Sequence, residues 1–92
     1  MTHDEIRAAI LSILGDIAPE ADLGQLKPQV ALRDQLDLDS MDVLNFTIAI
    51  HKRLGVEIPE TDAAQVASLE GAVAYVATSL EHGSRGRAGG DA

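Results

Sequence analysis

The chain contains no cysteine, and it has few aromatic and few basic residues. The absence of cysteine excludes disulfides, thiolate metal sites and a cysteine nucleophile, and it is compatible with a reducing compartment. Phe46 and Tyr75 are its two aromatic residues, too few for a surface that stacks the bases of single-stranded nucleic acid. The 7 basic and 15 acidic residues give a net charge of −8, which disfavours a phosphate backbone and favours basic protein partners. We therefore expect no nucleic-acid partner.

Long apolar runs are also missing. No stretch approaches the roughly 20 residues that cross a bilayer, and the N-terminus lacks the basic region and apolar run of a signal peptide. We therefore expect a cytoplasmic protein with no membrane partner. The 92 residues fit a single domain, which we expect to be monomeric.

Helical periodicity begins near the N-terminus. Thr2 and Glu5 have the spacing of a capping box. Apolar residues from Ile6 to Ile17 then form one stripe at helical spacing. Pro19 ends this first predicted helix, because proline disfavours helical backbone at the preceding residue.

A long connection follows, from Ala18 to about Asp39. It is unusually long for a compact domain, and such loops are often functional. Its apolar residues predict an ordered loop that packs on the core: Leu23, Leu26, Val30, Leu32 and Leu36.

A second helix is predicted from Asp39 or Ser40 to near Gly55. Asp39 is a good N-cap residue, and Asp42 adds negative charge to the first turn. Basic residues at 51–53 suit the last turn, and Gly55 suits the position after the helix.

A short helix is predicted over residues 61–66, and Ser68 begins a last helix with an apolar stripe that reaches Leu80. We expect a helical domain over residues 1–82 and a disordered Gly- and Arg-containing tail over 83–92. The predicted fold is all-α: a small bundle of three main helices plus one short helix, with a long loop between helices 1 and 2.

The second helix carries two apolar stripes. One contains Val43, Phe46, Ile50 and Leu54. The other contains Met41, Leu44 and Ile48. A helix in a small bundle normally turns one stripe to the core, so the second stripe is either buried under the long loop or exposed for a partner. Acidic residues flank its start: Asp34, Asp37, Asp39 and Asp42. The pattern alone supports burial and docking equally.

Ser40 follows an aspartate at the predicted helix start. By itself this position favours a simple role, because serine is common at helix starts and usually caps them. A phosphodiester on Ser40 would also gain from the helix N-terminus. Local physics alone favours the capping role.

The segment Leu36-Asp37-Leu38-Asp39-Ser40-Met41-Asp42 resembles the phosphopantetheine attachment motif of acyl carrier proteins. The segment from Leu54 to Pro59 and the last helix with Tyr75 resemble the same family. The resemblance covers roughly Ile6 to Leu80 and implies an acyl carrier. It places a 4′-phosphopantetheine arm, supplied by coenzyme A, on Ser40, and it implies a carrier and not an enzyme.

The resemblance also implies a partner-binding face. It assigns Met41, Leu44 and Ile48 to recognition, and it matches Asp39 and Asp42 to acidic residues that meet basic patches. We include Asp37, Glu57 and Glu60 in this face. The implied partners are a phosphopantetheinyl transferase and acyl-loading and acyl-processing enzymes with basic docking patches.

Two departures from the family stand out. The family often has glycine where this chain has Asp37. Fatty-acid-synthesis members usually continue acidic along the second helix, whereas this chain has Asn45 and then His51, Lys52 and Arg53. We therefore expect a specialised stand-alone carrier.

Two alternatives remain open. D-alanyl-type aminoacyl carriers also use Asp-Ser-Met, and an unmodified helical adaptor would need no arm. A serine hydrolase is disfavoured because His3, His51 and His82 lie in no recognisable catalytic context, and no nucleophile-elbow motif is present. The histidines are also not at metal-site spacing.

Overall fold

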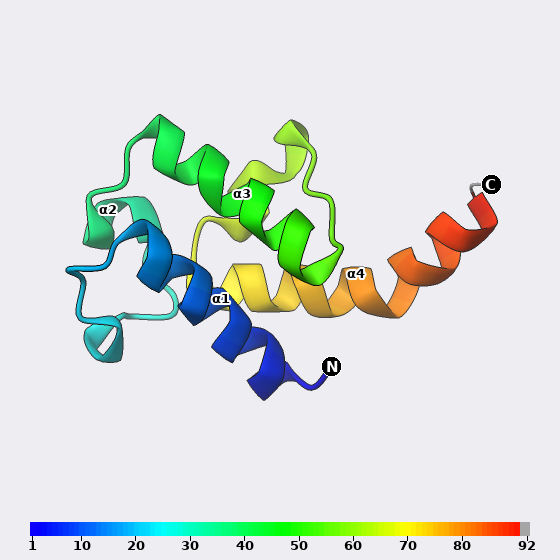
Figure 1. The fold of residues 1–92 in the computed structure, drawn as a ribbon, viewed down its shortest axis with the longest axis horizontal. Helices are drawn as coiled ribbons and strands as arrows, with labels where there is room; N and C mark the ends of the chain where they lie inside the picture. The colour runs from blue at the N-terminus through cyan, green and yellow to red at the C-terminus, as the bar shows by residue number, and fades with distance from the viewer. Residues whose placement is uncertain (91–92) are drawn as a thin grey trace.

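The computed structural model describes residues 1–90, with side chains through Glu81. Within that range its regular elements are all helices and it contains no strand, so the predicted all-α bundle is confirmed (Figure 1). The elements are α1 (His3–Ile17), η1 (Leu23–Gln25), α2 (Leu32–Leu36), α3 (Ser40–Leu54), η2 (Glu60–Val66) and α4 (Leu69–Gly90), where η is a 3₁₀-helix. No helix in these residues is both long and apolar enough to span a membrane.

The start of α1 is the predicted capping box. The Glu5 N–H donates to Thr2 Oγ1 at 3.1 Å, and the Thr2 N–H donates to Glu5 Oε1 at 2.8 Å. The hydrogen bond from the Thr2 backbone lowers the pKa of the Glu5 carboxyl. Two backbone donors that the helix cannot satisfy thus find partners at its first turn.

The core lies where α1 packs against both α3 and α4. Its buried members include Ile6, Ile10, Ile13 and Leu14 of α1, Phe46 and Ile50 of α3, and Leu69, Ala72 and Val76 of α4. Val43 and Leu54 are partly buried against this cluster, so the predicted core stripe of α3 is confirmed.

The long connection is ordered and held to the bundle by its backbone. The Leu32 N–H donates to the Ala67 carbonyl at 2.7 Å, and the Glu70 N–H donates to the Pro28 carbonyl at 2.9 Å. Leu32 is buried, but Val30 is 39% exposed, so the expectation that Val30 packs on the core is wrong. The helix α2 was not predicted, because five residues are too few to show a helical period.

The helix α4 continues to Gly90, past the predicted domain boundary at residue 82. The predicted disordered tail covers residues 83–92, and its last two residues lie outside the described part of the chain. The disorder of this segment therefore stays a prediction.

The link between α2 and α3 turns sharply at Asp37. Asp37 has φ 55° and ψ 43°, which is left-handed backbone. The turn lets the Leu38 N–H donate to the Arg33 carbonyl at 3.2 Å, and it directs the Leu38 side chain into the core. Glycine adopts this backbone without strain, which explains why the family often has glycine here.

Tyr75 of α4 is half-buried and donates a hydrogen bond of 2.7 Å to Asp62 Oδ2 of η2. Burial, and then the hydrogen bond and negative charge of Asp62, raise the pKa of the Tyr75 hydroxyl to about 12. The contact joins the short η2 segment to α4.

We expect Asp37→Val to lower the free energy of unfolding by about 1–2 kcal/mol, because a β-branched residue fits left-handed backbone poorly. Asp37→Asn should change it by less than about 0.5 kcal/mol, because asparagine tolerates this backbone. Urea denaturation followed by circular dichroism measures both. A Val variant as stable as the Asn variant would contradict the strained turn.

We expect the absorbance titration of tyrosinate to have its midpoint near pH 12 in the folded protein. The signal belongs to Tyr75 alone, since the chain has one tyrosine and no tryptophan. Because the folded pKa exceeds the ordinary value near 10, stability should fall as the pH rises from 10 through 12.

Asp62→Asn should lower that midpoint. Glu57→Gln should lower it less, because the negative charge of Glu57 raises the pKa of Tyr75 less than Asp62 does. The protein in denaturant is the reference, with a midpoint near 10. Equal midpoints for the folded and denatured protein would contradict the contact.

Candidate functional site

Ser40 is the first residue of α3, and its side chain is exposed. The residue that caps the helix is Asp39: the Asp42 N–H donates to Asp39 Oδ1 at 2.9 Å, and the Asp39 N–H donates to Asp42 Oδ2 at 3.3 Å. The Ser40 hydroxyl makes no hydrogen bond to any residue that the structure describes. Capping therefore does not account for the serine.

Buried side chains anchor the backbone on both sides of Ser40 in the sequence. Leu38, two residues earlier, is only 7% exposed, and Phe46, six residues later in α3, is also buried. The N–H groups of Ser40 and Met41 have no acceptor within the described residues. Because unpaired N–H groups and the helix dipole favour an anion, this position suits a phosphodiester on Ser40 Oγ.

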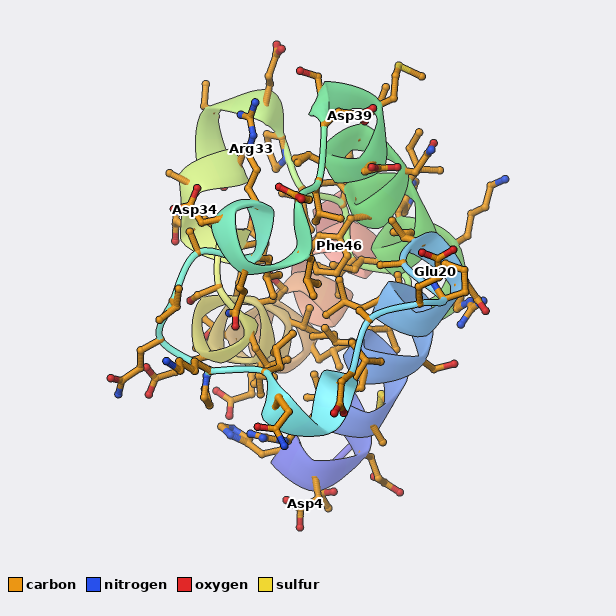
Figure 2. All side chains as sticks on the ribbon, turned by 90° about the vertical axis from the view of Figure 1, so that its left-hand side faces the viewer. Asp4, Glu20, Arg33, Asp34, Asp39 and Phe46 are labelled. Carbon is orange, nitrogen blue, oxygen red and sulfur yellow. The ribbon has the colours of Figure 1, made fainter. Side chains whose placement is uncertain are left out.

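Carboxylates gather at the same end of the molecule. Figure 2 looks onto this end and shows Asp34, Asp39 and Glu20 there, together with the base Arg33. Asp37 and Asp39 are exposed, whereas Asp42 is half-buried and accepts a hydrogen bond from the Asp39 N–H. No group of acidic or histidine side chains in the described residues could hold a metal ion. The arrangement is a negatively charged surface around a free hydroxyl.

The second apolar stripe of α3 faces solvent. Met41 is 60% exposed, Leu44 49% and Ile48 42%. The long connection passes over other parts of the bundle and does not cover them. The structure thus decides between the two alternatives for this stripe: it is an exposed face and not an additional part of the core.

The remaining acidic residues of the predicted partner face lie further along the chain. Glu57 and Glu60 are both exposed. They belong to the segment that returns from the C-terminal end of α3 into η2 (Figure 1). Asp37, Asp39 and Asp42 thus lie beside Ser40 at the start of α3, whereas Glu57 and Glu60 belong to a later segment of the chain.

A largely apolar pocket of about 230 Å³ lies between α2, α3 and η2. Leu38 and Val43, which lie on either side of Ser40 in the sequence, both line it, and Ala63 and Ala64 of η2 contribute small side chains. This pocket was not predicted from the sequence. The small residues in the short η2 segment were its only signal, and they could not show which helix they would face.

Among the side chains that the structure describes, no histidine gives Ser40 a catalytic base. His51 lies eleven residues later in the same helix, which corresponds to about 16 Å along its axis. His3 is next to Asp4, and Figure 2 shows Asp4 and Asp39 at opposite ends of the view. The side chain of His82 lies outside the described residues. With an exposed, unactivated hydroxyl, the site is suited to modification and not to nucleophilic catalysis.

Comparison with known proteins shows which family the chain belongs to. The family model "Phosphopantetheine attachment site" matches residues 4–76. The acyl carrier protein of Rubrobacter xylanophilus is 30% identical over 82 residues, which cover 89% of this chain and 96% of that protein. The acyl carrier protein of Helicobacter hepaticus is 25% identical over 82% of this chain and 92% of its own length.

A further relative has a more specific name. The meromycolate extension acyl carrier protein of Mycobacterium tuberculosis is 28% identical over 76 residues, which cover 83% of this chain and 65% of that protein. The family match spans most of the helical domain and includes Ser40. The chain belongs to the family of acyl carrier proteins, which hold acyl groups on a covalently attached 4′-phosphopantetheine and are carriers, not enzymes.

Proposed function

We propose that Ser40 is the residue that carries the 4′-phosphopantetheine, and that the chain presents a thioester-bound acyl group from this position. The observation that carries the proposal is the exposed Ser40 hydroxyl, which is free because Asp39 caps α3 in its place. The acyl carrier family supplies the chemistry, since its members carry the same arm.

Attachment joins the Ser40 oxygen to the phosphorus next to pantetheine in coenzyme A. The hydroxyl proton is lost, and adenosine 3′,5′-bisphosphate leaves. The N–H groups of Ser40 and Met41 favour the resulting negative charge, while the nearby carboxylates oppose it. The arm supplies the thiol that forms the thioester, so a chain without cysteine can carry an acyl group.

Like other family members, the chain interacts with a phosphopantetheinyl transferase and with acyl-processing enzymes. The docking face that we propose combines the exposed stripe with the acidic cluster, and its residues are Met41, Leu44, Ile48, Asp37, Asp39 and Asp42. Glu57 and Glu60 extend its negative charge. Partners with basic patches would be steered to this face and could dissociate after each step, because electrostatics raises association rates more than affinity.

We propose further that this is a specialised, monomeric, cytoplasmic carrier that acts on its own set of partners. The basic end of α3 supports the specialised role, since it departs from the acidic pattern of fatty-acid-synthesis members. The relative named for meromycolate extension shows that the family includes dedicated carriers. An aminoacyl carrier of the D-alanyl type is the alternative, and the identity of the co-purified thioester cargo separates the two.

The attachment proposal predicts one modification per chain. Incubation of apo protein with coenzyme A and a broad-specificity phosphopantetheinyl transferase should raise the intact mass by one phosphopantetheinyl unit. Ser40→Ala should abolish the gain, and Ser12→Ala, a matched change at an exposed serine of α1, should preserve it. A gain retained by Ser40→Ala, or no gain by apo wild type with transferases of its own organism, would refute the attachment site.

The docking proposal predicts a selective effect of the exposed stripe. If Leu44 is a central anchor of the docking stripe, Leu44→Ser should lower kcat/KM of the transferase about five- to thirty-fold, which corresponds to about 1–2 kcal/mol of binding energy. Thermal stability should change little, because half of the Leu44 side chain is already in water. Val30→Ser alters a similarly exposed residue on another surface and should leave kcat/KM unchanged; equal losses in both variants would exclude a specific docking stripe.

A further inference from the structure

The helix α3 carries opposite charges at its two ends. We infer that the partner enzymes of this carrier present basic residues near Ser40 and an acidic residue opposite Lys52, at the other end of α3. This inference rests on the proposed function, because it specifies the partners of the same docking face.

Lys52 belongs to the exposed stripe by its position on the helix. It follows Ile48 by four residues and Met41 by eleven. At about 100° per residue, its direction differs from that of Met41 by about 20° and from that of Ile48 by about 40°. A partner that covers Met41 and Ile48 therefore also meets Lys52.

The neighbouring Arg53 has a different role. Its guanidinium forms an ion pair with Asp16 of α1 and donates to Ser12 Oγ at 3.3 Å, so it connects α3 to α1. The side chain of Lys52 is exposed and makes no ion pair or hydrogen bond within the described part of the chain. The packing of the bundle thus uses Arg53 and leaves Lys52 available to a partner.

The helix dipole offers a competing explanation, because it favours cations in the last turn of any helix. That effect depends on distance along the axis and is the same on every face of the helix. It accounts for a basic last turn as a whole. It favours a cation in line with the docking stripe no more than a cation on any other face, so it does not select the position of Lys52.

The two ends act as separate charges. Ser40 and Lys52 are twelve residues apart, which is about 18 Å along the helix. The Debye length at physiological salt is about 8 Å, so the carboxylates around Ser40 do not neutralise the field of Lys52. An enzyme with basic residues along its whole docking patch is attracted at one end and repelled at the other. An enzyme with a carboxylate opposite Lys52 is attracted at both ends.

The test measures binding of the apo chain, which needs no arm, to a β-ketoacyl synthase of fatty-acid synthesis whose docking patch is basic throughout. Lys52→Glu should tighten binding about three- to ten-fold at low salt, and the gain should shrink as salt increases. Lys27→Glu makes the same charge change outside α3 and should alter the Kd less than about two-fold. Thermal melts establish that both variants are folded.

A charge reversal in the enzyme completes the test. When the basic residue at the end of the patch furthest from its active-site entrance is replaced by glutamate, wild-type carrier should bind more tightly and Lys52→Glu more weakly. Two results together would overturn the inference. One is that Lys52→Glu and Lys27→Glu change the Kd for the unaltered enzyme equally. The other is that the altered enzyme binds wild-type carrier no more tightly than Lys52→Glu, or binds neither. That result would leave arm attachment untouched, since the mass measurement on Ser40 decides it separately.

Discussion

The reciprocal capping of Asp39 and Asp42 determines where α3 begins, and the site depends on it. Because each aspartate accepts the other's backbone N–H, the helix needs no cap from the next residue. Ser40 is therefore the first helical residue, with an exposed hydroxyl that has no structural task. The buried Leu38 anchors the preceding turn, so the backbone that carries the hydroxyl has a fixed position. A serine that capped the helix itself would have its oxygen engaged with the backbone.

The same helix separates packing from recognition by its two faces. Phe46 and Ile50 are buried in the common core, and α3 packs against α1, which secures α3 without any contribution from the opposite side. Met41 and Ile48 are consequently free to stay in water at a small cost in stability. The charges follow the helix axis instead: carboxylates surround its start, and basic residues occupy its last turn. The helix dipole favours both placements. Opposite charges at the two ends of α3 therefore cost little folding stability.

The short segments around α3 depend on backbone contacts more than on their own periodicity. Hydrogen bonds from Leu32 to Ala67 and from Glu70 to Pro28 fasten the long connection to the junction of η2 and α4. At that junction a Cβ on Gly71 would lie 2.4 Å from the Gln65 carbonyl oxygen, so only glycine allows this close approach. These contacts position η2 beside α3, and the apolar pocket next to Ser40 lies between the two.

Local signals in the sequence were sufficient to determine the ends of α1 and α3, the core stripe of α3 and the motif around Ser40. Capping boxes and a 3.6-residue period act over a few neighbouring residues, so they can be read without knowing the fold. The tertiary structure alone decided that Met41, Leu44 and Ile48 are exposed, that Val30 is not in the core, and that Arg53 is engaged while Lys52 is not. Each of these outcomes depends on which distant segment packs beside a residue, and no local pattern encodes that.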